Sequence, residues 1–189
     1  MPPPLGPASR HLPKVAAVPS NSERKPVSGC GLFGSAAEIA TPSVMTMSSG
    51  ELTGGDKPVR FTCGTPHPRT PPLGWSGWPQ GTKSIALVID DSNAPITPYV
   101  YWIVFNISPA TSDILEGQLP PDARQARNSA GTAGYEPPCP GPAGHTYRFT
   151  VYALKSVIDL PDGAPLQSAW RAIAAAAIGR GRMTVTAKS

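Results

Sequence analysis

The sequence has 189 residues, a length that fits one domain with a tail better than two domains. Its 25 prolines and 19 glycines together stay just below the content at which a whole chain is expected to be disordered. The net charge of +4 is divided evenly between the first 42 residues and the remainder. Because the charges are scattered along the chain, the composition argues against a nucleic-acid-binding protein.

The first 42 residues are predicted to be a disordered, proline-rich leader, separate from a domain that spans residues 43–189. The leader contains eight prolines and few large apolar residues. Such a segment cannot bury enough apolar surface to offset the chain entropy that folding would cost. Aliphatic and aromatic residues become frequent only from about Val44 onward.

Cys30 lies in the leader within VSGCGLFGSAAE, which has the small residues and cysteine that end a bacterial lipoprotein signal. The segment before it is too polar to be the hydrophobic region of a signal peptide. Two alternatives stay open: Cys30 is an ordinary cysteine of the leader, or it is the lipidation site of a chain whose signal is absent or altered here. For the localisation we favour a membrane-anchored or extracytoplasmic lipoprotein over a cytoplasmic protein.

The first part of the predicted domain is rich in turns. Residues 41–63 alternate β-branched and polar residues around a Gly-Gly pair and predict two short strands joined by a turn. Residues 65–84 are dense in proline and glycine and predict a loop. Trp75 and Trp78 have enough apolar area to anchor that loop to the protein.

The second part of the domain contains the clearest signals of regular structure. Residues 84–91 and 99–107 are continuous apolar runs of strand length, typical of strands buried on both faces. Residues 145–154 alternate apolar and polar side chains and predict another strand. Residues 164–179 predict the single helix, with a proline near its start, an alanine-rich interior and a glycine at its end. Residues 182–187 predict a last strand.

The ten residues from Glu136 to His145 contain four prolines, a cysteine and two glycines directly before the alternating strand. Proline fixes φ and lacks an N–H group, so this loop is expected to hold one shape. Because residues two apart in a strand point to the same face, His145 and Tyr147 project together beside the loop. The segment therefore predicts one side of a small polar pocket.

Four motifs, in this order and spacing, resemble the phosphatidylethanolamine-binding protein family, whose bacterial branch is called Raf kinase inhibitor-like. They are residues 71–95, 99–108, 127–155 and the closing helix. The resemblance extends from about Val44 to the C-terminus. It implies a mainly β protein: an antiparallel β-sandwich with a C-terminal helix and a small anion-binding pocket at one end.

Seven residues form this pocket if the family's positions are transferred to the chain. They are Asp91, Asn93, Tyr101, Pro138, Cys139, His145 and Tyr147. Histidine, tyrosine and amide groups can donate hydrogen bonds to an oxyanion, and Asp91 would orient His145 or pair with its protonated form. A simpler interpretation has Asp91 capping a turn and His145 as an ordinary strand residue, but the four motifs together favour the binding site.

The chain departs from the family's pattern at several pocket positions. The second acidic residue of the family is Asn93 here, which removes a negative charge, and its usual histidine in the middle strand is Tyr101. The family's His-Arg-Tyr motif reads His-Thr-Tyr, and Arg148 is expected to face away from the pocket. The fold tolerates these changes, whereas the preference for a ligand can change with them.

The resemblance places Cys63 and Cys139 in loops near the same end of the sandwich. In an exported protein we expect them to form a disulfide, which leaves Cys30 as the odd thiol that could carry a lipid. In a cytoplasmic protein the two cysteines would instead be buried free thiols.

The resemblance implies a non-enzymatic binding protein for a small anionic ligand: a phosphate group, a phospholipid headgroup such as phosphatidylethanolamine, or a phosphorylated ligand. The alternative is a protein-interaction module that inhibits a kinase or a protease. A hydrolase that uses Ser92 with Asp91 and His145 is disfavoured, because the chain lacks a Gly-x-Ser-x-Gly motif. We expect no cofactor, and dispersed histidines argue against a metal site. The sequence leaves the oligomeric state and the protein partner open.

Removal of the leader tests the predicted domain boundary. A chain that starts at residue 43 should melt at the same temperature as the full chain, because the leader is expected to contribute no packed surface. Thermal unfolding followed by circular dichroism compares the two chains. A decrease of many degrees in the shortened chain would show that the leader packs on the domain.

Overall fold

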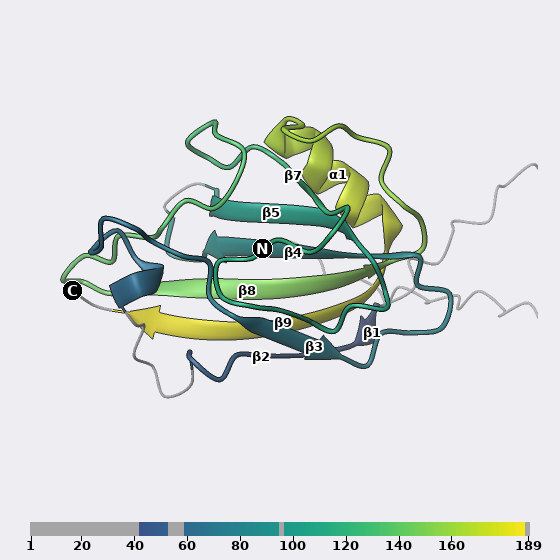
Figure 1. Ribbon diagram of the computed structural model, residues 1–189, viewed down its shortest axis with the longest axis horizontal. Coiled ribbons are helices and arrows are strands. Elements are labelled where there is room, and N and C mark those ends of the chain that lie inside the picture. Colours follow the sequence, from purple (N-terminus) through teal and green to yellow (C-terminus); the bar gives the residue numbers. More distant parts are fainter. Residues whose placement is uncertain (1–41, 53–58, 95–96, 188–189) are drawn as a thin grey trace, which may run out of the picture. The chain divides into compact units, whose positions relative to one another are not determined.

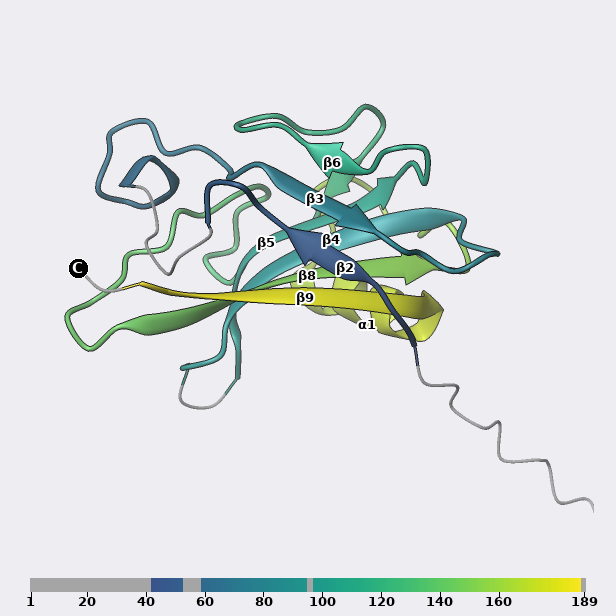
Figure 2. The ribbon, with the colours of Figure 1, turned by 90° about the horizontal axis from the view of Figure 1, so that it is seen from below.

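Two β-sheets pack face to face, and one helix covers the outer face of the larger sheet (Figures 1 and 2). The structure is a computed structural model that describes residues 42–52, 59–94 and 97–187. The predicted leader, with Cys30, lies outside the described residues apart from its last position. Its boundary and its disorder therefore stay predictions.

The larger sheet has six strands in the order β1-β9-β8-β4-β5-β7. Neighbouring strands are antiparallel except β1 and β9, which are parallel. The strands are β1 (Ser43–Val44), β4 (Ser84–Asp91), β5 (Tyr99–Ile107), β7 (Arg124–Gln125), β8 (His145–Leu154) and β9 (Ala177–Ala187). The three strands expected from residues 84–91, 99–107 and 145–154 thus form at the predicted positions.

Strand β4 lies in the interior of this sheet, and all its residues are buried. Ile85, Leu87 and Ile89 pack in the core between the two sheets. Ala86 and Val88 pack on the opposite face, in a second core beneath the helix. The continuous apolar run is therefore explained by burial of both faces, as the sequence indicates.

The smaller sheet has three antiparallel strands, β2 (Thr46–Ser48), β3 (Leu73–Ser76) and β6 (Asp113–Ile114), in the order β2-β3-β6. Figure 2 shows it on the opposite side of the larger sheet from the helix. The prediction of a loop over residues 65–84 was wrong for β3. Leu73 and Trp75 are two apart and both are buried against the larger sheet, and this tertiary contact outweighs the local turn signals.

The strand expected after the Gly-Gly pair does not form in residues 59–63, the part of that segment that the structure describes. The structure has a short 3-10 helix, η1 (Val59–Phe61), near the end of that range. Phe61 is fully buried in the core between the sheets, and the guanidinium of Arg60 lies 4.5 Å from the centre of its ring. A single buried side chain can anchor one turn of helix, whereas a strand would need an alternating set of contacts.

The helix α1 (Leu166–Ala176) begins after Pro165, as predicted, but ends three residues before Gly179. The chain passes directly into β9 at Ala177, so the last strand is longer than residues 182–187. Gly179 and Gly181 are strand residues over which Met45 packs closely. A Cβ atom at Gly181 would lie 2.7 Å from the Met45 carbonyl oxygen, so close packing and not helix termination explains this glycine.

The close contact at Gly181 predicts a loss of stability in Gly181→Ala. The added methyl group overlaps backbone atoms, and overpacking of this kind typically costs about 1–3 kcal/mol of unfolding free energy. Gly141→Ala is the matched control, because a Cβ atom there would have nothing within 4 Å. Urea unfolding of the three proteins measures the difference. Equal stability of Gly181→Ala and the parent would contradict the packing described here.

Candidate functional site

One end of the larger sheet brings together polar side chains from three strands. Strand β4 ends there at Asp91, and β5 and β8 begin there at Tyr99 and His145 (Figure 1). The register places Asp91 opposite Tyr99 in β5 and opposite Tyr147 in β8. Directly opposed residues point to the same face. These side chains therefore lie on the inner face of the sheet, toward the smaller sheet.

Asp91 and His145 form the central contact of this site. The Asp91 Oδ2 atom lies 2.6 Å from His145 Nδ1. The carboxylate is almost fully buried, with 4% of its side chain exposed, whereas 36% of the imidazole is exposed. An ionised Asp91 accepts the Nδ1–H bond, so it fixes the ring and leaves the Nε2 atom available to a ligand.

The loop after β4 is bound to the first residues of β8. The other Asp91 oxygen, Oδ1, accepts a 2.7 Å hydrogen bond from the backbone N–H of Asn93. Asn93 Oδ1 accepts a 2.8 Å bond from the Thr146 N–H, and Ser92 donates its N–H and its hydroxyl to the Thr146 carbonyl, each at 3.1 Å. Asp91 therefore caps this turn and orients His145 at the same time. The exposed Asn93 keeps its amide NH₂ group as a donor.

Tyrosines lie beside the imidazole. The rings of His145 and Tyr147 are nearly parallel, with centres 6.2 Å apart, and the Tyr101 ring meets the Tyr147 ring edge-on at 5.6 Å. Tyr147 is fully buried, and Tyr101 is partly exposed. Burial, followed by the charge of Asp91, raises the pKa of Tyr147 to about 12. Burial also raises the pKa of Tyr101, so both hydroxyls stay protonated and neutral at physiological pH.

A register shift in β5 explains the position of Tyr101. Ile89 pairs with Trp102 while Asp90 pairs with Val100, so β5 holds one extra residue at this point. Such a bulge changes the alternation of side chains. As a result the neighbours Tyr101 and Trp102 both pack against the core between the sheets, whereas Val100 belongs to the core beneath the helix.

The proline-rich loop is held on both sides. A disulfide joins Cys63 to Cys139, whose Cα atoms are 5.3 Å apart, and the Cys63 N–H donates to the Pro138 carbonyl at 3.2 Å. The Glu136 N–H donates to the Tyr101 carbonyl at 2.9 Å, which ties the loop to β5. Pro138 and Cys139 thus contact the loop that follows η1. The other five predicted residues form the cluster around Asp91 and His145.

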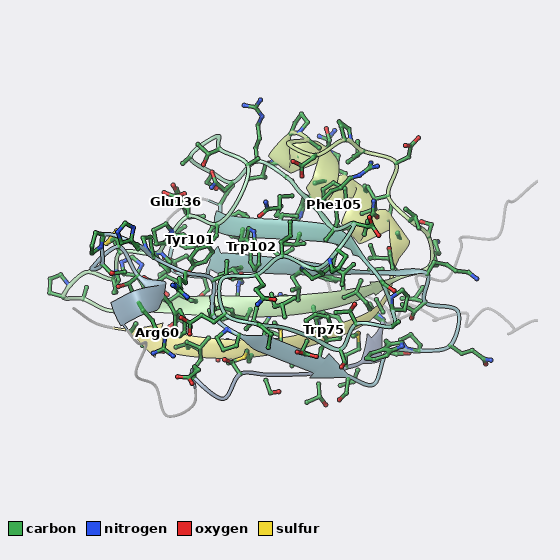
Figure 3. The ribbon with its side chains drawn as sticks, viewed as in Figure 1. Arg60, Trp75, Tyr101, Trp102, Phe105 and Glu136 are labelled. Atoms are coloured by element: carbon green, nitrogen blue, oxygen red, sulfur yellow. A yellow bond between two sulfur atoms is a disulfide. The ribbon has the colours of Figure 1, made fainter. Side chains whose placement is uncertain are left out.

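Two residues of this site were not predicted from the sequence. The Tyr99 hydroxyl lies 2.9 Å from both carboxylate oxygens of Glu136, and the Tyr99 and Tyr101 rings are 5.0 Å apart. Figure 3 shows Glu136 beside Tyr101 at the end of the sheet where β5 begins. The Tyr-x-Tyr spacing could have indicated Tyr99. Glu136 is the first residue of the loop that was predicted to form one side of the pocket, but the sequence did not indicate that its side chain belongs to the site.

Arg148 lies on the other face of the larger sheet, as expected from its position between pocket residues. It forms a two-pronged ion pair with Asp90, its direct cross-strand partner, in which Nε lies 2.9 Å from Oδ1. Asp90 is 2% exposed. The neighbouring residues Asp90 and Asp91 therefore have different roles, one in a structural ion pair on the outer face of the larger sheet and one in the candidate site.

The structure also has a cleft of about 610 Å³. Its lining includes Trp102 and Tyr135, which are adjacent in sequence to the site residues Tyr101 and Glu136. The Trp102 Nε1–H group donates to Gln125 at 2.6 Å.

Within the described ranges no group of three His, Cys, Asp or Glu side chains could hold a metal ion. In the same ranges, no helix is both long and apolar enough to cross a membrane.

Comparisons with known proteins agree with this architecture. The sequence profile of phosphatidylethanolamine-binding proteins matches residues 48–188. A UPF0098 protein of Methanothermobacter thermautotrophicus is 37% identical over 134 residues, which are 68% of this chain and 88% of that protein. A Mycobacterium tuberculosis protein named "Putative lipoprotein LppC" is 43% identical over 136 residues, covering 70% of this chain and 66% of that protein.

Solved structures show the same fold. A homologue of phosphatidylethanolamine-binding proteins from Chlamydia trachomatis, CT736, superposes with a TM-score of 0.70 at 31% identity, covering 78% of this chain and 99% of that chain. Escherichia coli YbcL superposes with a TM-score of 0.69 at 27% identity, covering 77% of this chain and 98% of that chain. The predicted family and the predicted fold are confirmed.

The disulfide can be tested by counting thiols. Protein taken from its native compartment and denatured without reductant should show at most one reactive thiol of its three cysteines, and none if Cys30 carries a lipid. After reduction, the thiols of Cys63 and Cys139 should react as well. Three reactive thiols before reduction would show that Cys63 and Cys139 are not bonded in the native protein.

Proposed function

Since the chain belongs to the phosphatidylethanolamine-binding protein family, we propose that it binds a small anionic group at His145 without changing it chemically. The ligand class is a phosphate group, free or as part of a phospholipid headgroup or another phosphorylated molecule. The observation that carries this proposal is the contact of 2.6 Å between His145 and the buried Asp91. The carboxylate holds one ring nitrogen, so the Nε2 atom of the partly exposed imidazole is left to bind an anion.

The neighbouring groups suit this role. A protonated His145 donates a charge-assisted hydrogen bond through Nε2, about twice as strong as a bond between neutral groups. The amide of the exposed Asn93 and the hydroxyl of the half-buried Tyr101 are neutral donors. The buried Tyr147 ring supports the imidazole by stacking beneath it. One strong donor with weaker ones around it gives an anion both affinity and orientation.

The arrangement favours binding over hydrolysis. A catalytic serine needs a hydrogen bond to a general base. The Ser92 hydroxyl instead donates to the Thr146 carbonyl at 3.1 Å, and the Nδ1 atom of His145 is held by Asp91. Ser92 therefore serves to hold the turn after β4 and is not positioned as a nucleophile.

We extend the proposal to the location of the protein. The similarity to a mycobacterial protein named as a lipoprotein favours the alternative in which Cys30 carries a lipid. A lipid tether would hold the anion site close to a membrane surface, where phospholipid headgroups are abundant. The match to that relative covers 70% of this chain.

His145→Ala tests the proposed anion site. Loss of a charge-assisted hydrogen bond costs about 1.5–3 kcal/mol, so inorganic phosphate should bind about one to two powers of ten more weakly. Tyr147→Phe should have a smaller effect, because it removes only a neutral hydroxyl. Titration of phosphate into labelled protein, followed by NMR, measures each affinity.

The control for this experiment is His67→Gln, which changes an exposed histidine in another loop and should leave phosphate affinity unchanged. Folding of each variant is checked by circular dichroism. If folded His145→Ala binds phosphate as well as the parent does, the anion site is elsewhere. The alternative of a protein-interaction module that inhibits a kinase or protease would then replace the present proposal.

A further inference from the structure

Strand β9 forms one border of the larger sheet, and β1 covers only the first part of it (Figure 1). β1 pairs with β9 at Gly179 and Arg180, and the Met45 N–H donates to the Arg180 carbonyl at 2.9 Å. The backbone of Met45 then crosses close over Gly181, and the next residues form β2 of the smaller sheet. Among the residues that the structure describes, no strand pairs with residues 182–187 on that side, so the second half of β9 is an open edge.

The open edge presents the backbone groups of three residues. The Arg180 carbonyl points away from β8, toward β1. Backbone groups alternate in direction along a strand, and the register with β8 is unbroken over the rest of β9. The N–H and C=O groups of Arg182, Thr184 and Thr186 therefore also point away from β8. In the described part of the chain they have no hydrogen-bond partner, and such groups are a template for another strand.

The side chains on the outer side of this edge carry positive charge. Thr184 is the cross-strand partner of Arg148, so it lies on the outer face of the larger sheet. By alternation Arg180 and Arg182 share that face, and both are exposed. The Arg182 Nε–H donates to the Thr150 hydroxyl at 2.9 Å. Within the ranges that the structure covers, neither Arg180 nor Arg182 forms an ion pair with a carboxylate.

The inner side of the edge is apolar. Met183 and Val185 point into the core between the two sheets, where Val185 is buried and Met183 is partly buried. A strand added beside β9 would place every second side chain next to Met183 and the remaining ones next to Arg182. A segment that alternates apolar and acidic residues therefore suits both sides of the edge.

We propose that residues 182–186 of β9 are a docking edge for an extended acidic segment of a partner protein, which adds to the larger sheet as an antiparallel strand. Its backbone bonds to the free groups of Arg182, Thr184 and Thr186, which is a recurring mode of peptide recognition. Its acidic side chains lie on the outer face beside the two arginines, and its apolar side chains lie beside Met183. The inference is independent of the proposed anion site, because it uses none of the residues of that site.

The charge of the edge decides which partner fits. A second copy of this chain, paired through the same edge, would add its own arginines to the same face and leave all of them without a counter-charge. An anionic membrane surface would neutralise the arginines but would leave the backbone groups of β9 unpaired. An acidic extended segment satisfies the arginines and the backbone groups together.

The probe is an end-blocked hexapeptide of alternating glutamate and valine, titrated into the full chain by calorimetry at low ionic strength, because added salt screens exposed charges. In an antiparallel pair the glutamates would be opposite Arg182, Thr184 and Thr186, so the glutamate N–H groups would face β9. N-methylation of the glutamates should therefore abolish binding. The matched peptide with N-methylated valines should still bind, and a peptide with lysine in place of glutamate should not.

Hydrogen exchange followed by NMR locates the contact. In the free protein the amides of Arg182, Thr184 and Thr186 should exchange rapidly, whereas those of Met183 and Val185, which face β8, should exchange slowly. With the peptide at ten times its Kd, exchange of the first three amides should slow about tenfold, in proportion to the fraction of free protein. The amides that face β8 provide an internal control in the same strand.

Two variants separate the backbone contribution from the charge. Thr184→Pro removes an N–H group from the open edge, where the fold tolerates proline, and should abolish peptide binding. Arg182→Gln keeps the edge and removes one charge, so it should weaken binding about two- to fivefold, the usual strength of a cross-strand charge pair. Arg124→Gln is the matched control: it makes the same change in β7, at the opposite border of the sheet, and should leave the affinity unchanged. Circular dichroism checks that each variant is folded.

Several results would overturn the docking edge. They are equal binding of the glutamate and lysine peptides, no binding of the glutamate peptide to folded protein, and unchanged exchange of the three edge amides at saturation. Protection of these amides without peptide, together with dimers in analytical ultracentrifugation, would assign the edge to a second copy of the chain. Binding to vesicles of phosphatidylglycerol that is lost in Arg182→Gln but kept in Thr184→Pro would assign the arginines to a membrane surface and overturn the proposal.

Discussion

Strand β4 pairs along its length with β5 on one side and β8 on the other, and the candidate site depends on this pairing. Because the register is continuous with β8 from Ser84 to Asp91, the last residue of β4 meets the third residue of β8. A shift of one residue would turn Asp91 toward the helix and Asp90 toward the smaller sheet. Such a shift is disfavoured because the two faces differ in side-chain size: Ile85, Leu87 and Ile89 pack on one face and the smaller Ala86 and Val88 on the other.

The same alternation separates two charged pairs that are adjacent in sequence. On one face the buried Asp90 binds the partly exposed Arg148 in an ion pair, and on the other Asp91 binds His145. The first pair holds the arginine on the outer face of the larger sheet, away from the site. The second pair leaves part of the imidazole exposed. The electrostatic character of the site therefore follows from the pleat of the sheet as well as from the residue types present.

Loops complete the site because they are attached to the strand ends at several points. The Asp91 carboxylate holds the turn after β4, and the Tyr101 carbonyl holds the proline-rich loop through Glu136. A disulfide and the bond from Cys63 to Pro138 attach that loop to the segment after η1. With so few free backbone donors in the proline-rich loop, these contacts define where Glu136 lies.

The sequence alone determined the main strands, the helix start, the family and the cluster around Asp91 and His145, because apolar runs, alternation and motif order are local patterns. It failed where tertiary contacts outweigh local preference: β3 formed within a turn-rich segment because Trp75 is buried, and Gly179 lies in a strand because the chain packs closely there. The bulge at Tyr101 and the position of Glu136 were decided only by tertiary structure. Both depend on contacts between segments that are distant in sequence, and local sequence patterns do not predict such contacts.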